Sequence, residues 1–253
     1  AIELLGNEAA NQLRKQAATA KKGFFSGKDQ LEPADLSLEC LRMVYRLLFM
    51  FYIEARPELG YVPIAKSEVY LKGYSLESLR ELELQPLNTP HARDGFYFDA
   101  TLRRLFSLVA NGCGFEQHAG EQQHLAGAIT GAKDTFALAP LDSRLFDETT
   151  MPLLAKVRFP NHVWQTIIRL MSLTRAKKGG RGGGQRRGRV SYQLLSINQL
   201  GAVYEALLSY RGFFADEDLY EVKPAPKKAG HRASDDDEGA SDNEDNEDDA
   251  NEG

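Results

Sequence analysis

The stretch LSLECLRMVYRLLFMFYIEAR, residues 36–56, carries the strongest structural signal in the sequence. Its apolar residues recur at helical spacing, and Asp35 or Ser37 can cap a helix that Pro57 would end. In its second half the apolar residues cover every side, which is typical of a helix that is buried all round. We therefore expect a central helix over residues 36–56.

Three charged residues are embedded in this apolar helix: Arg42, Arg46 and Glu54. An unpaired charge in a protein interior is expensive, so we expect each of them to have a neighbouring partner that holds the helix in register. A direct functional role for these side chains is the alternative.

Amphipathic segments on both sides of the central helix predict more helices. Residues 1–30 begin in mid-pattern, as if a longer chain had been cut. Ser75 and Asp99 are candidate helix caps, and further helices are expected at 75–82, 99–111, 150–154 and 161–171. Tyr-, Phe- and Val-rich pieces could be extended at 96–98, 190–192 and 219–222. The predicted fold class is mainly α: a multi-helix bundle with a few short strands and a disordered acidic C-terminal tail.

The segment SINQLGAVYEALLSY, residues 196–210, predicts a well-capped amphipathic helix. Ser196 and Gln199 have the spacing of a capping box. One face collects the apolar side chains Ile197, Leu200, Tyr204, Leu207 and Leu208. Gly201 lies on the same face and costs about 1 kcal/mol relative to alanine, so we expect another backbone to approach closely there. The cap and the apolar face predict a helix whose role is to pack against another element.

The charge of the chain is distributed asymmetrically. Residues 234–253 hold eleven acidic residues and no lysine or arginine, so the net charge of −5 leaves +6 on residues 1–233. A basic body favours a polyanionic partner, although an ordinary solvated surface would have a similar composition. The acidic stretch has the composition of a disordered linker, a solubilising tail or a mimic that covers basic residues.

A basic glycine-rich loop is expected at 175–189. It places seven positive charges among six glycines: Arg175, Lys177, Lys178, Arg181, Arg186, Arg187 and Arg189. Such a loop can follow a phosphate backbone through Coulombic contacts and counterion release. A solvated connection between two helices is equally compatible with the sequence, although the loop is long for a connector.

Motifs for catalysis or metal binding are absent from the sequence. It contains no P-loop, no Gly-x-Ser-x-Gly, no His-Glu-x-x-His and no nuclease Asp…Glu-x-Lys pattern. Cys113, His118 and His124 match no zinc spacing, which favours a polar loop over a metal site. Two isolated cysteines indicate a reducing compartment, and the seven-residue apolar run at 47–53 is too short to span a bilayer. We expect a soluble, cytoplasmic protein.

Three blocks of the sequence resemble a known arrangement. They are CLRMVYRLLFMFYIEARPELGYVP (40–63), LFD (145–147) and RVSYQLLSINQLGAVYEALLSYRGFFADEDLYEV (189–222). In this order they resemble the helical region that precedes the catalytic domain of large adenine-specific DNA methyltransferases. These are the type IIG restriction–modification enzymes and the methyltransferases of the DISARM and BREX phage-defence systems, of which the DISARM type is the most similar.

The resemblance implies an organisation in three regions: 1–30, a truncated N-terminal helix; 31–222, a helical spacer domain; and 223–253, an acidic linker or tail. In that family the Gln-Leu-Gly-x-x-Tyr-Glu helix leads into an S-adenosylmethionine-binding core. The face expected to pack on that core includes Gln199, Gly201, Tyr204 and Glu205. Implied partners are double-stranded DNA, the catalytic domain and other defence-system subunits, with no membrane.

The chain departs from the family at the catalytic step. It has no Asn-Pro-Pro-Tyr/Phe motif, since Phe159-Pro-Asn-His162 differs from it, and it has no glycine-rich methyl-donor loop after a strand. We therefore expect no cofactor in this chain, with S-adenosylmethionine needed only by the parent enzyme. An independent, non-enzymatic nucleic-acid- or partner-binding protein with a regulatory acidic tail is the alternative. A restriction nuclease fragment is the weakest reading, because the acidic-Lys site is missing.

Overall fold

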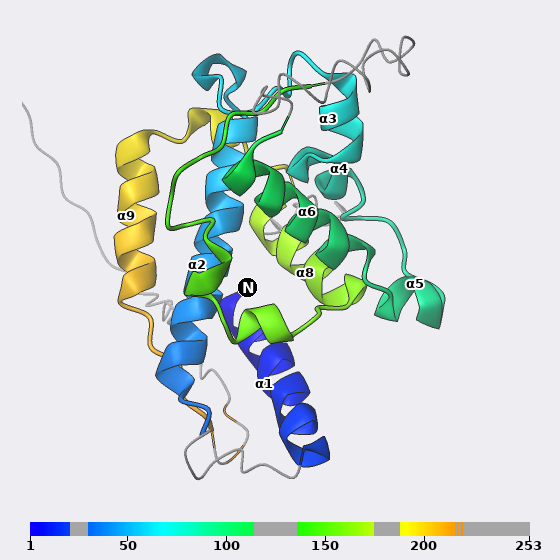
Figure 1. Cartoon of the computed structure of the whole chain (residues 1–253), viewed down its shortest axis with the longest axis vertical. Helices are drawn as coiled ribbons and strands as arrows, with labels where there is room; N and C mark the ends of the chain where they lie inside the picture. Colours follow the sequence, from blue (N-terminus) through cyan, green and yellow to red (C-terminus); the bar gives the residue numbers. More distant parts are fainter. Residues whose placement is uncertain (21–29, 114–135, 175–187, 216, 218, 220–253) are drawn as a thin grey trace, which may run out of the picture. The chain divides into compact units, whose positions relative to one another are not determined.

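The structure is a computed structural model that describes residues 1–20, 30–113, 136–174, 188–215, 217 and 219 (Figure 1). The chain forms two units, residues 1–214 and 215–253. In the second unit only Ala215, Glu217 and Leu219 are described, so the acidic stretch 234–253 lies outside the described residues.

The first unit is mainly helical, as predicted. Its helices are α1 (Ile2–Thr19), α2 (Pro33–Glu54), α3 (Glu68–Gly73), α4 (Leu76–Glu81), α5 (Pro90–Asp94), α6 (Tyr97–Asn111), α8 (Asn161–Ser172) and α9 (Ile197–Leu208). Short 3-10 turns connect them at η1 (Pro57–Leu59), η2 (Glu148–Thr150), η3 (Leu154–Lys156) and η4 (Tyr192–Leu194).

The expected short strands are not found in the described part of the chain. Extended pairing there is limited to two isolated antiparallel bridges, Cys113 with Leu138 and Leu173 with Arg189. Tyr97 instead begins α6 and Tyr192 begins η4, because their aromatic rings pack equally well on a helix. Residues 220–222 of the third piece lie outside the described residues.

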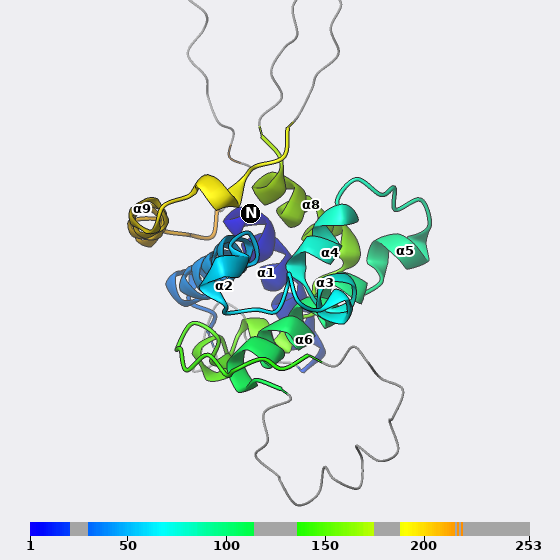
Figure 2. The same cartoon turned by 90° about the horizontal axis from the view of Figure 1, so that it is seen from above.

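Helix α2 is the centre of the first unit. It begins at Pro33, whose fixed φ suits the first helical turn, and no side chain caps it, so the prediction of Asp35 or Ser37 as cap was wrong. Both views place α9 on one side of α2 and α6 and α8 on the other (Figures 1 and 2). From residue 46 to residue 54, every residue except Phe49 is buried, which confirms the expected all-round burial.

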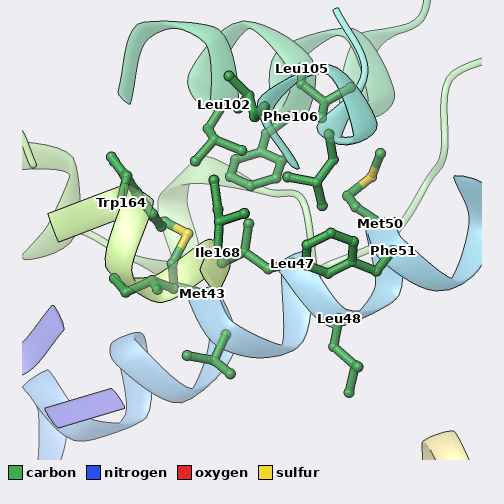
Figure 3. Packing of buried hydrophobic residues seen from close by; sticks show 14 of the residues in the cluster. Met43, Leu47, Leu48, Met50, Phe51, Leu102, Leu105, Phe106, Trp164 and Ile168 are labelled. Atoms are coloured by element: carbon green, nitrogen blue, oxygen red, sulfur yellow. The ribbon is translucent and has the colours of Figure 1, made fainter. Parts of the chain in front are cut away.

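The core forms where α2, α6 and α8 meet. Leu47 and Met50 of α2 and Leu105 of α6 are completely buried, as is Ile168 of α8 (Figure 3). Burying side chains of this size stabilises a fold by roughly 1.5–3 kcal/mol each. Helix α1 packs against α2 and contributes Leu5 and Ala9 to the core.

The embedded charges of α2 do have partners, but these are backbone groups rather than opposite charges. Arg42 donates to the carbonyl of Thr150 (2.7 Å), and Arg46 donates through Nε and Nη2 to the carbonyl of Leu145. Glu54 accepts hydrogen bonds from two amides of α4. Together they fix the 145–150 segment and helix α4 to the central helix.

Of the two candidate caps Ser75 and Asp99, the structure confirms the first and contradicts the second. Ser75 caps α4, accepting from the amide of Ser78 at 3.1 Å. Asp99 does not cap a helix, because α6 already begins at Tyr97 and Asp99 is buried within its first turn. Its carboxylate reaches across to α8 instead, accepting from the indole of Trp164.

The predicted helix at 196–210 is α9, and its capping box is present. Ser196 accepts from the amide of Gln199 (3.2 Å), and the Gln199 side chain accepts in return from the amide of Ser196 (2.8 Å). The close approach expected at Gly201 is not found in this chain, since a Cβ there would meet nothing within 4 Å. It occurs instead at Gly212, where a Cβ would overlap the hydroxyl of Ser37.

Because the space around Gly201 is open, Gly201→Ala is expected to raise the free energy of unfolding by about 1 kcal/mol through helix propensity and reduced unfolded-state entropy. Chemical denaturation of both proteins measures the difference. Gly212→Ala is the matched control and should give no gain, because Ser37 occupies the space of the added methyl group. A loss of stability in Gly201→Ala would contradict the open environment.

Candidate functional site

Six of the seven basic residues singled out for DNA binding lie outside the described residues. These are Arg175, Lys177, Lys178, Arg181, Arg186 and Arg187. Arg189 is described and stands at the C-terminal base of the loop, where its side chain is 48% exposed.

The base of the loop is fixed by backbone pairing between its two ends. Thr174 N donates to Gly188 O at 2.8 Å, and Val190 N donates to Ser172 O at 2.7 Å. The amide of Gly188 also donates to the hydroxyl of Thr174 (3.0 Å). The two ends of the basic segment are therefore paired with each other beside the C-terminal end of α8.

Acidic side chains of α4 and of the turn after it contact the base of the loop. Arg189 contacts Glu77 through Nη1 (3.4 Å) and Glu83 through Nε (3.5 Å). Arg80 pairs with Glu77 at 3.3 Å and donates to the carbonyl of Val190 at 2.6 Å. Helix α4 and the turn after it thus hold the loop base through alternating charges, which we call the loop-base cluster: Glu77, Arg80, Glu83 and Arg189.

This cluster contains buried polar atoms without hydrogen-bond partners. They are Nε of Arg80 and both carboxylate oxygens of Glu83, and the nearby Ser172 hydroxyl is in the same state. Such atoms are rare in proteins because each costs about 1–3 kcal/mol. The sequence alone does not predict this cluster. The one signal for it is the i,i+3 spacing of Glu77 and Arg80, which is typical of an ion pair on a helix.

The segment after the loop base is anchored to two helices. Tyr192 of η4 stacks on Phe51 of α2 with 4.9 Å between ring centroids, and its hydroxyl donates to the carbonyl of Met171 at the end of α8. Arg56 donates to the carbonyls of Gln193 and Leu195. The loop base and the start of α9 are therefore held on one rigid scaffold, a few residues apart in the chain.

Helix α9 leaves most of its apolar side chains exposed. Leu200 is buried, and Tyr204 rests on the ring of Tyr45 with centroids 4.5 Å apart. The exposed face of α9, with the turn before it and the chain after it, includes Leu194, Ile197, Val203, Leu208, Tyr210 and Phe213. The exposed apolar side chains of α9 itself flank the buried Leu200 rather than standing opposite it, and apolar side chains left exposed in such a group are typical of an interaction surface.

The four residues expected to pack on a further domain lie on this helix. Gln199 is exposed and occupied by the capping box, Gly201 is half-buried, and Tyr204 and Glu205 are exposed. Helix α9 packs on α2, where Tyr204 contacts the ring of Tyr45, and its remaining side chains are mostly exposed among the described residues.

The described part of the chain contains two free cysteines and individual His, Asp and Glu residues. No group of three or more His, Cys, Asp or Glu residues there could hold a metal ion. Burial raises the pKa of the Cys40 thiol to about 12, so it stays protonated, and Cys113 is half-buried. His118 and His124 lie outside the described residues.

The described residues therefore bring the two ends of the basic segment together and leave apolar side chains exposed on and around the helix that follows. Across the described helices, none is long and apolar enough to cross a membrane. No family model matches the chain, and comparison with curated proteins and with solved structures found no match.

Proposed function

We propose that this chain is the helical DNA-engaging and scaffolding part of a cytoplasmic adenine-specific DNA methyltransferase of restriction–modification or phage defence. The exposed apolar face of α9 carries the proposal. That helix belongs to the sequence block 189–222, which resembles the segment that leads into the catalytic core of these enzymes. In this proposal the core, with its S-adenosylmethionine, covers the open side of α9, and this chain alone transfers no methyl group.

Charge supports the DNA-engaging role. Residues 1–233 carry a net charge of +6, and seven basic residues are concentrated in the 175–189 segment whose two ends are fixed at one place on the scaffold. Glycines between the charges offer no rigid geometry for reading base edges. The contacts are therefore phosphate contacts, which bind duplex DNA without sequence preference and weaken steeply with salt.

The test is a fluorescence-anisotropy titration of a labelled DNA duplex at several salt concentrations. The loop variant replaces Arg181, Arg186, Arg187 and Arg189 with glutamine. We expect it to flatten the slope of log affinity against log salt by about 3–4, because each phosphate contact contributes about 0.9. A second variant lacks residues 234–253 and should bind more tightly, most of all at low salt, since eleven acids no longer compete.

The matched control also replaces four exposed basic residues with glutamine, at Lys66, Lys72, Arg93 and Lys156. It has the same net charge as the loop variant, so a generic charge effect changes both equally. If the loop variant and the control bind alike, the 175–189 segment is only a connector. If the wild-type chain and the tail deletion both fail to bind DNA, the DNA-engaging role is wrong.

A further inference from the structure

A pocket opens between α2, α6, α8 and the 148–155 segment, apart from the loop base and from α9. Its volume is about 60 Å³. The buried wall is apolar and sulfur-rich, with Met43 of α2, Phe106 of α6 and Trp164 of α8, which Figure 3 shows in place. Glu148, Ala155 and Arg103 are the exposed members of the lining and form its mouth.

The cation of Arg46 is buried in this wall, and no carboxylate of the described residues lies within salt-bridge distance, although Glu148 and Asp147 act on it from further away. The residue is 3% exposed, and its guanidinium lies 5.1 Å from the ring centre of Phe106 and 5.3 Å from that of Phe146. Nε and Nη2 both donate to the carbonyl of Leu145, and Nη1 makes no hydrogen bond to the described residues. Burial lowers the pKa of Arg46 to about 10, which still leaves it charged at neutral pH.

The other charges of the pocket are already neutralised or lie at its rim. Asp99 is buried, but its carboxylate accepts from Arg103 (2.8 Å), from the amide of Phe159 (3.3 Å) and from the indole of Trp164 (3.2 Å). Glu148 is exposed to water. Arg46 is therefore the one buried pocket charge among the described residues with no carboxylate in contact, and the exposed Glu148 and Asp147 stabilise it only from a longer distance.

We propose that this pocket binds a small carboxylate with a compact apolar body. The carboxylate accepts from Nη1 of Arg46, and the hydrocarbon part lies against Phe106 and Trp164. An anion here compensates a charge that burial otherwise leaves expensive. The volume of the pocket limits the size of the ligand. It has room for about four or five water molecules, and therefore for a ligand of about five heavy atoms such as propionate.

The probe is sodium propionate, which is titrated into the protein. A parallel titration with sodium chloride at the same ionic strength is the control. Trp164 is the single tryptophan of the chain and lines the pocket, so its fluorescence and its indole N–H resonance report binding directly. We expect a saturable change in both signals with propionate. 1-Propanol, which has the same apolar body without the charge, should give at least about tenfold weaker binding because it cannot pair with the guanidinium.

Three variants leave the buried wall of the pocket unchanged. Ala155→Leu fills the exposed mouth and should weaken propionate binding at least about tenfold, as a leucine side chain occupies much of the space, whereas Ala100→Leu on the exposed side of α6 should not. Glu148→Gln removes a like charge from the rim and should tighten binding about threefold. The proposal is overturned if no saturable change occurs, if 1-propanol binds as well, or if Ala155→Leu binds like wild type.

Discussion

Replacing Asp99 with alanine is expected to lower the free energy of unfolding by about 3–5 kcal/mol, the range found when one partner of a buried charge network is removed. The carboxylate is 1% exposed and joins α6 to α8 through one oxygen that accepts from both the amide of Phe159 and the indole of Trp164. Its other oxygen accepts from Arg103. Arg103 can recover water, but the amide and the indole are buried and lose their only acceptor.

Urea denaturation followed by far-ultraviolet circular dichroism measures this effect. Asp94→Ala is the matched control, because Asp94 is 59% exposed and its ion pairs among the described residues are those with Arg93 and His162. That substitution should change stability by less than about 0.5 kcal/mol. A cost below about 1 kcal/mol for Asp99→Ala would show that the α6–α8 contact does not depend on this carboxylate.

Glu54 is expected to make stability depend on pH. Complete burial raises the pKa of its carboxyl to about 7, although three hydrogen bonds, from the amides of Leu76 and Glu77 and the hydroxyl of Tyr70, act to lower it. The folded chain therefore retains a proton that the unfolded chain releases near the ordinary value of 4.5. The stability from this group is fully present below that value and is lost as pH rises through about 7.

Glu54→Gln isolates this contribution, because glutamine does not titrate. Between about pH 5 and pH 8 the free energy of unfolding of the wild type should fall by about 2–3 kcal/mol relative to that of Glu54→Gln. Glu81→Gln changes an exposed carboxyl on α4, the helix whose amides bind Glu54, and it should not alter how stability depends on pH. A constant difference between wild type and Glu54→Gln across this range would mean that the carboxyl stays ionised.

Local patterns predicted local structure well in this chain. The all-round apolar run indicated the buried helix α2, and the Ser196–Gln199 spacing indicated the capping box, because both depend on residues within one or two turns of each other. The start of α2 was placed three residues late, since Pro33 at the first turn needs no capping side chain.

The partners of polar side chains could not be predicted in the same way. Asp99 has the residue type and position of a cap, yet its partners Phe159, just before α8, and Trp164, within α8, lie about 60 residues away. Gly201 satisfied the pattern for close packing on an apolar face, but the close approach is made by Gly212, because the chain turns back toward Ser37 after α9. The loop-base cluster depends in the same way on contacts between α4 and residues about 100 positions later.

The long-range partners of α2 also impose an order of events during synthesis. Arg42, Arg46 and Glu39 bind backbone groups that lie 99 to 115 residues further along the chain. A ribosome adding about 5–20 residues each second needs roughly 5–20 s to deliver them. Throughout that interval the most apolar segment of the protein has emerged without the segments that satisfy its charges, so the nascent chain depends on protection from premature association more than its helical content would indicate.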